Sequence, residues 1–346
     1  MSHSPATPSN TATQRLLKAA RMLFAISAMA GTLAAQAAPR TEPKPDWSTH
    51  DMPSQKGRIV LVTGGTSGMG YEDALALTRA GAEVIIAARN AERGREAIAN
   101  IKQAVPEARV QFETLANLQS VRDLANRLQG RLPRLDVLIN NAAIMSPPVR
   151  GVSADGYEMQ LATNYLGHFA LTGLLMPLLR KSDDGRVVSL SSIAAGRAIL
   201  NFDDLQAERH YDPFAAYSQS KLAILKWSIE LQQRSDAAGW GIRSIAAHPG
   251  VAVTELIARG PGLDSQFGKQ WAVERDRYHS AAQGALPTLY AGTALEAVGG
   301  AYYGPTGDNE KRGPLGFAKM PPAAADRSNS ATLWQLSERL TGVTYR

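Results

Sequence analysis

The chain has 346 residues, of which 44% are hydrophobic and 20% are charged, as in ordinary globular proteins. Its 37 Lys and Arg residues outnumber its 31 Asp and Glu residues, and the first 57 residues carry half of that excess. The remaining charges mix both signs, which argues against nucleic-acid binding because such proteins gather basic residues on one face. The chain has no cysteine and only six scattered histidines, so disulfides and thiolate chemistry are excluded and no metal site is expected.

Residues 1–45 are predicted to form an N-terminal extension that resembles a signal peptide. Basic residues between positions 15 and 21 precede an apolar run over residues 22–35, and small residues follow at the place of a cleavage site. The run is short and rich in alanine, so a membrane anchor is disfavoured and no stable membrane span is expected after processing. Export to the periplasm or the medium is therefore expected. The alternative is a cytoplasmic protein with a misplaced start, since Met52 lies just before the first strand.

Prolines predict a linker over residues 39–57, and residues 46–346 are predicted to form a single domain. Apolar, β-branched runs predict strands, and segments of helical spacing lie between them. The predicted strands cover residues 58–63, 83–89, 109–115, 135–143, 185–192, 242–250 and 301–304. The predicted helices cover residues 71–81, 91–104, 118–130, 155–179, 213–238 and 328–341. This alternation is typical of a parallel sheet buried on both faces, so we expect a Rossmann-type, doubly wound α/β fold.

A glycine-rich turn joins the first predicted strand to the first helix and predicts a nucleotide site. Its sequence is TGGTSGMG over residues 63–70. The first glycine permits a tight turn, and the later ones let the helix N-terminus approach a pyrophosphate with free N–H groups. The residues expected to contact the cofactor here are Gly64, Thr66, Ser67, Gly68, Met69 and Gly70.

The end of the second strand indicates which dinucleotide binds. NAD sites place Asp or Glu there to hold the ribose hydroxyls. This chain has Arg89 and Asn90 instead. An arginine can pair with the 2′-phosphate of NADP through charge-assisted hydrogen bonds, to which Ser67 and Asn90 can add. The missing acid and the arginine together predict NADP(H) as the cofactor.

Tyr217 and Lys221 lie four residues apart in a predicted helix, and therefore on one face of it. A free phenol has a pKa of about 10. We expect the nearby ammonium group to favour the phenolate and to lower the pKa of Tyr217 toward neutrality. Tyr217 would then act as general acid when a carbonyl is reduced, or as general base when an alcohol is oxidised.

These motifs, with NNAA at residues 140–143 and two serines after the fifth strand, resemble those of the short-chain dehydrogenase/reductase family. The stretches NYLGHFALT, LNFDDLQAERHYDPFAAYSQSKLA and HPGVAVTEL are similar to its retinol dehydrogenase and protochlorophyllide reductase-like branch. The resemblance implies that Ser192 holds the substrate oxygen and that Asn164 supports Lys221 through a water in a proton relay. It also implies cofactor contacts by Asn140, Ala142, Tyr217, Lys221, Pro249, Gly250 and Thr254.

We therefore predict an NADP(H)-dependent oxidoreductase that transfers a hydride between the cofactor and a carbonyl or alcohol group of a small molecule. Residues 251–284 lack a clear pattern and are expected to form a mobile lid, whose aromatic residues favour an apolar substrate. One alternative is an NADPH-dependent reductase of C=C bonds on the same fold, and another is a non-catalytic NADP(H)-binding regulator. The intact Ser, Tyr, Lys and Asn set argues against the regulator. The sequence leaves open whether the chain forms a homo-oligomer.

Overall fold

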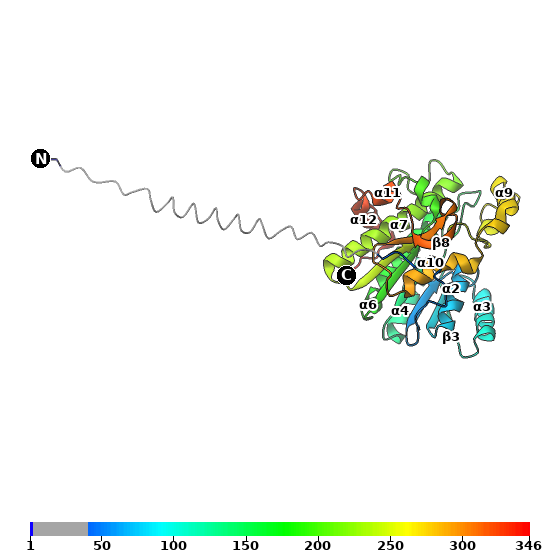
Figure 1. Cartoon of the computed structure of the whole chain (residues 1–346). Coiled ribbons are helices and arrows are strands. Elements are labelled where there is room, and N and C mark those ends of the chain that lie inside the picture. The colour runs from blue at the N-terminus through cyan, green and yellow to red at the C-terminus, as the bar shows by residue number, and fades with distance from the viewer. Residues whose placement is uncertain (3–40) are drawn as a thin grey trace. The chain divides into compact units, whose positions relative to one another are not determined.

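One sheet of eight strands, in the order β3-β2-β1-β4-β5-β6-β7-β8, organises the folded part of the chain. The computed structural model describes residues 1–2 and 41–346, and Glu42–Arg346 form a compact unit (Figure 1). Its strands are β1 (Ile59–Thr63), β2 (Glu83–Ala88), β3 (Arg109–Thr114), β4 (Val137–Asn140), β5 (Gly185–Leu190), β6 (Ile242–Ala247), β7 (Tyr302–Gly307) and β8 (Arg312–Phe317). All neighbours pair in parallel except β7 and β8, which are antiparallel. The predicted α/β fold is confirmed, while the signal-peptide-like segment lies outside the described residues.

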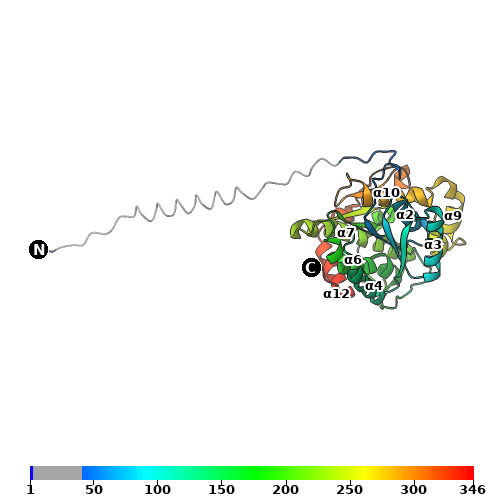
Figure 2. The same ribbon diagram turned by 90° about the horizontal axis from the view of Figure 1, so that it is seen from below.

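Helices cover both faces of this sheet. The long ones are α2 (Gly68–Arg79), α3 (Ala91–Ala104), α4 (Leu118–Arg131), α6 (Gly167–Leu179), α7 (Pro213–Ala238), α10 (Ala281–Thr293) and α12 (Ser330–Thr341). One apolar core lies between the sheet and α4, α6 and α7, and a second lies between the sheet and α2, α3 and α10. Figure 2 shows α2 and α10 on one side of the molecule, with α4 and α6 on the other. Such two-sided burial explains why the central strands are continuously apolar.

Helix α7 carries the Tyr217–Lys221 pair, and its ends are where the sequence predicts them. Asp212 is the N-cap residue, and its side chain accepts a hydrogen bond from the backbone N–H of Ala215. Proline at the first helical position, with its fixed φ, favours the start. The helix ends at Gly239, which adopts a left-handed conformation with φ of 62°. These local signals set the two ends of the helix that carries the pair.

The predicted helix over residues 155–179 begins four residues later than expected. Residues 152–158 form a tight turn, closed by a bridge between Val152 and Glu158. The carboxylate of Glu158 then accepts from the N–H groups of Gln160 and Leu161 and starts α5 (Met159–Leu161). A π-helical turn, Ala162–Leu166, precedes α6. The sequence also gave no clear signal for α10 or β8, because glycine and proline interrupt the periodicity of both.

The segment before β1 is part of the fold rather than the expected linker. Pro43 and Gln55 are buried, and Trp47 is only 7% exposed. The indole packs edge-on against Tyr290 of α10, with ring centroids 5.3 Å apart. Residues 42–56 therefore extend the core on the α10 side of the sheet.

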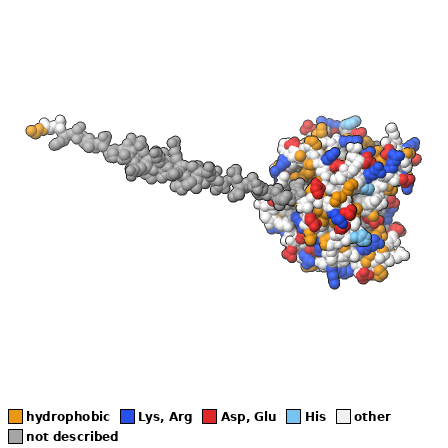
Figure 3. Space-filling model, in the orientation of Figure 1, with side chains coloured by type: hydrophobic (Ala, Val, Ile, Leu, Met, Phe, Trp, Pro, Cys, Tyr) orange, Lys and Arg blue, Asp and Glu red, His pale blue; other side chains and the backbone are white. Residues whose placement is uncertain are grey.

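Charges of both signs are mixed on the face of the molecule shown in Figure 3. This mixture matches the balanced composition of residues 42–346 and offers no single-sign field on that face to attract a polyanion. None of the helices that the structure describes combines the length and the hydropathy required to cross a bilayer.

Candidate active site

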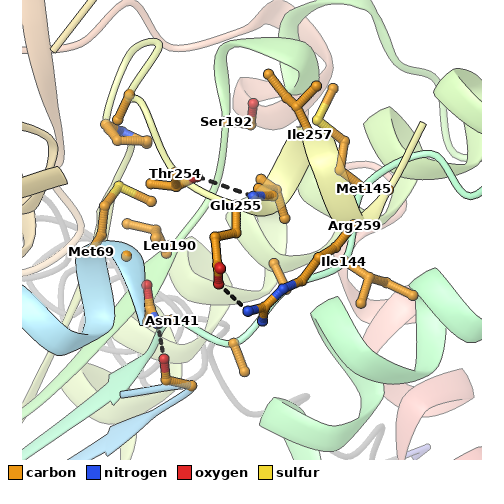
Figure 4. A pocket seen from close by; sticks show the side chains of 18 of the residues that line it. Met69, Asn141, Ile144, Met145, Leu190, Ser192, Thr254, Glu255, Ile257 and Arg259 are labelled. Carbon is orange, nitrogen blue, oxygen red and sulfur yellow. Dashed lines mark hydrogen bonds and ion pairs between the residues drawn. The ribbon is translucent and has the colours of Figure 1, made fainter. Parts of the chain in front are cut away.

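A large cavity of about 1100 Å³ lies at the carboxyl ends of the parallel strands, where open α/β sheets bind their ligands. Its walls come from the segments after β1, β2, β4, β5 and β6, from α7 and from the β7–β8 turn. It is lined by these predicted site residues: Gly64, Thr66, Ser67, Gly68, Met69, Gly70, Arg89, Asn90, Ala142, Ser192, Tyr217, Lys221, Pro249, Gly250 and Thr254. Asn140 and Asn164 lie outside its lining. Figure 4 shows part of this pocket.

The glycine-rich turn requires glycine because it packs closely against the segment that follows β4. A Cβ atom on Gly64 would lie 2.9 Å from Cα of Ala142, and one on Gly70 would lie 2.3 Å from Nδ2 of Asn141. Gly64 also has a positive φ of 69°. Ser67 precedes α2 as its N-cap residue but makes no side-chain cap bond. Its hydroxyl and the first N–H groups of α2 therefore remain available to an anionic group, as a pyrophosphate site requires.

The end of β2 and the start of α3 form a basic corner of the cavity. Asn90 is the N-cap residue of α3, and its Oδ1 accepts from the backbone N–H of Arg93 at 3.0 Å. Arg89 is exposed and has no ion-pair partner within the described chain, so its guanidinium is free to bind an anion. Arg93 lines the same cavity, although the sequence analysis did not single it out. The sequence signal that could have identified Arg93 is its position four residues after Arg89, in the first turn of the predicted helix over residues 91–104.

Ser192, Tyr217 and Lys221 come together where β5 ends against α7. The side chain of Ser192 lies near the Tyr217 hydroxyl and lowers its pKa. The Nζ atom of Lys221 donates to the carbonyl oxygen of Leu190 at 2.8 Å and lies 5.9 Å from the centre of the Tyr217 ring. The neighbouring Ser191 uses its hydroxyl differently, donating to the Lys221 carbonyl at 2.8 Å. Of the two serines, Ser192 is thus the one whose hydroxyl meets the tyrosine.

The expected lowering of the tyrosine pKa is wrong for this structure. Burial raises the pKa of Tyr217 to about 12, and the hydrogen bond from Ser192 opposes the rise only in part. Burial also lowers the pKa of Lys221 to about 7. Both shifts have burial as their main cause, because removal from water disfavours the charged form of each group. Tyr217 is therefore a neutral phenol near pH 7.

Asn164 lies in the π-helical turn, and both the oxygen and the nitrogen of its side-chain amide form hydrogen bonds. Its Oδ1 accepts from the N–H of Ile144 at 2.9 Å, and its Nδ2 donates to the Ile144 carbonyl at 3.0 Å. Nδ2 also donates to the hydroxyl of Ser220, the residue before Lys221, at 2.9 Å. The side chain thus fixes the segment after β4 against α7. The proton relay through a water stays a prediction.

The two asparagines at the carboxyl end of β4, Asn140 and Asn141, have different surroundings. Asn140 is fully buried, and its Nδ2 donates to the Thr172 hydroxyl in α6 at 3.2 Å. Asn141, which the sequence analysis did not select, lines the cavity and donates from Nδ2 to the carbonyl of Thr63 at 2.8 Å. Asn141 therefore joins the ends of β1 and β4 beneath the glycine-rich turn, while Asn140 fastens the sheet to a helix.

The part of the cavity beyond Tyr217 is apolar. Met145, Ala194, Ile257 and Trp271 pack with Tyr217 in one cluster, and partly buried Phe214 joins it. Trp271 lies on α9 (Gln266–Glu274), within the segment expected to form a lid. Tyr217 thus borders an apolar wall that suits a hydrocarbon body.

Sequence comparison identifies the family. The family described as short chain dehydrogenase matches residues 58–260. Mouse polyprenol dehydrogenase is 37% identical over 303 residues, which are 84% of this chain and 86% of the relative. Mouse retinol dehydrogenase 13 is 38% identical over 299 residues, which are 83% of this chain and 84% of the relative.

Solved structures share the fold. The crystal structure of an uncharacterised protein from Mycobacterium paratuberculosis matches with a TM-score of 0.72 and 36% identity, over 87% of this chain and 99% of that one. A short chain dehydrogenase from Shigella flexneri, solved in complex with NADP, matches with a TM-score of 0.56 and 24% identity, over 72% of this chain and 98% of that one.

Proposed function

Because the chain belongs to the short-chain dehydrogenase family, in its retinol dehydrogenase-like branch, we propose that it is an NADP(H)-dependent oxidoreductase acting on a carbonyl or alcohol group. The observation that carries this proposal is the meeting of Ser192, Tyr217 and Lys221 between a glycine-lined nucleotide cradle and an apolar wall. The nucleotide cradle suits a dinucleotide, and the apolar wall suits a lipophilic substrate. When bound, the nicotinamide would supply or accept the hydride.

The chain's own residues are suited to move the proton. Ser192 and Tyr217 line the same cavity, and the Ser192 side chain interacts with the Tyr217 hydroxyl, so both are placed to bind one substrate oxygen. A phenol whose pKa is about 12 is protonated at neutral pH, which favours donation to a carbonyl oxygen. The neutral phenol is thus the form that the reductive direction requires, and the direction of the reaction in the cell stays open. The Nζ atom of Lys221 is fixed on the Leu190 carbonyl, and in its protonated form it would place positive charge on the side of the Tyr217 ring.

Two features support the choice of NADP(H) and of an apolar substrate. Arg89 follows the end of β2, where an NAD enzyme would carry an acidic residue, and Arg93 in the first turn of α3 lines the same cavity. The apolar cluster around Met145 and Trp271 matches the lipophilic alcohols named in the relatives, retinol and polyprenol. The proposed substrate class is accordingly a long, apolar aldehyde or ketone and the matching alcohol.

The direct test follows NADPH and NADH consumption by the protein with a panel of apolar aldehydes and ketones. We expect turnover with NADPH, and the Tyr217→Phe variant should lose it by about 10²-fold or more while still binding NADPH. Equal use of NADH would remove the role given to Arg89. Tight NADPH binding without turnover would favour a C=C reductase or a regulator instead.

A further inference from the structure

Glu255 places a carboxylate inside the basic part of the cofactor cavity. It follows Thr254 and precedes α8 (Leu256–Arg259), in the segment after β6. Its carboxylate forms an ion pair with Arg259 of α8, drawn in Figure 4, and a second with Arg93 of α3 at 3.8 Å. Glu255, Arg93 and Arg259 all line the cavity. One carboxylate therefore touches an arginine from each of two walls.

The contact with Arg93 lies where the proposed cofactor would place its extra charge. Arg93 is held at the start of α3 by its bond to Asn90, next to the free guanidinium of Arg89. Building on the proposed use of NADP(H), we propose that Glu255 is a counter-ion that competes with the 2′-phosphate for Arg93. It thereby limits the preference for NADP(H) over NAD(H) and links the phosphate site to the lid.

The geometry allows this exchange to occur without leaving a charge unpaired. A phosphate monoester carries about −1.5 to −2 charge near pH 7, so it attracts Arg93 more strongly than a single carboxylate does. Glu255 can release Arg93 because Arg259, four residues later on the same segment, still pairs with it. All three side chains are between 41% and 56% exposed, so solvent keeps the effect moderate.

The test compares dissociation constants of NADPH and NADH, measured from nicotinamide fluorescence, for the wild type and for Glu255→Gln. Removing the carboxylate should tighten NADPH about three- to tenfold and leave NADH within about twofold, because only NADPH carries the phosphate. The gain should shrink as salt is raised from low to high concentration. Asp264→Asn serves as the matched control, since it removes another lid carboxylate that has no ion pair within the described chain.

A double-mutant cycle then tests whether Arg259 acts through Glu255. Arg259→Gln alone should weaken NADPH, because Glu255 would turn entirely to Arg93. The same change in the Glu255→Gln background should have no effect on NADPH. The proposal is overturned if Glu255→Gln leaves NADPH binding unchanged or weaker, if NADH tightens equally, or if Arg259→Gln weakens NADPH in both backgrounds.

Failure of the counter-ion role of Glu255 can be distinguished from failure of the proposed function. The wild-type ratio of NADPH to NADH affinity tests the cofactor assignment by itself, without any variant. A wild type that prefers NADPH, combined with an unchanged ratio in Glu255→Gln, would preserve the proposed cofactor and reject the counter-ion role. A wild-type protein that binds NADPH and NADH equally well would contradict the proposed choice of NADP(H) before any variant is measured.

Discussion

Asp73 is a residue of α2 whose burial lowers the free energy of unfolding near neutral pH. Its side chain is fully buried, and neither carboxylate oxygen has a hydrogen-bond partner. Burial raises the pKa of Asp73 well above its ordinary value, and the nearby charge of Glu72 adds to the rise. The carboxyl group is therefore neutral in the folded protein at a pH where it is ionised in the unfolded chain. Its contribution to stability is present below the unfolded pKa of about 4 and is lost as pH rises above it.

Replacing Asp73 by Asn should therefore stabilise the protein near neutral pH, by about 1–3 kcal/mol, because the unfolded chain no longer gains free energy by ionising there. The difference between variant and wild type should vanish near pH 4 and grow toward pH 7. Urea unfolding of both proteins at several pH values measures it. Glu107→Gln, an exposed carboxylate, is the control. A difference that stays constant with pH would show that ionisation of Asp73 is not its source.

At the scale of elements, the segment before β1 packs into the core, although its prolines led to the prediction of a linker. Trp47 packs on Tyr290 and extends the core that α2, α3 and α10 form against the sheet. Trp47→Ala should therefore lower the free energy of unfolding by about 3 kcal/mol. His50→Ala, three residues away and exposed, should change it little. Chemical denaturation measures both, and equal effects of the two changes would contradict the packing role.

The contact between Trp47 and Tyr290 also predicts the stability of a shorter form of the protein. A protein that starts at Met52 would lack Trp47 and should show a similar loss of stability relative to residues 42–346. Comparison of the thermal unfolding of these two forms tests this expectation. Equal melting temperatures would show that residues 42–51 add nothing to the fold.

Elements with strong local signals were predicted almost to the residue. Helix α7 has a capping aspartate, a proline at its start and a glycine at its end, and its predicted and observed bounds coincide. Helix α10 was missed because Gly284, Pro287 and Gly292 break its periodicity, and it forms because it packs against α2 and the sheet. The π-helical turn at Asn164 was also missed, since only the tertiary bonds to Ile144 and Ser220 favour it.

At the scale of the whole molecule, the cavity is built from segments that are distant in the sequence. The glycine-rich turn and the Tyr217–Lys221 pair were predictable because each lies within one short motif. The contact between Arg93 and Glu255 joins residues of α3 and of the segment after β6, which no local pattern connects. The pKa of Tyr217 was likewise beyond the sequence, because its burial depends on side chains contributed by the lid and by the segment after β4.

The most direct test of the account is transfer of deuterium from NADPH labelled at carbon 4 of the nicotinamide to an apolar aldehyde such as retinaldehyde. The two stereospecifically labelled forms should be used in turn, and the product should be analysed by mass spectrometry and NMR. We predict that one of the two forms delivers one deuterium to the carbinol carbon, and that Tyr217→Phe abolishes the transfer. Deuterium on a former C=C carbon, or no transfer from either form across the substrate panel, would contradict the central claim.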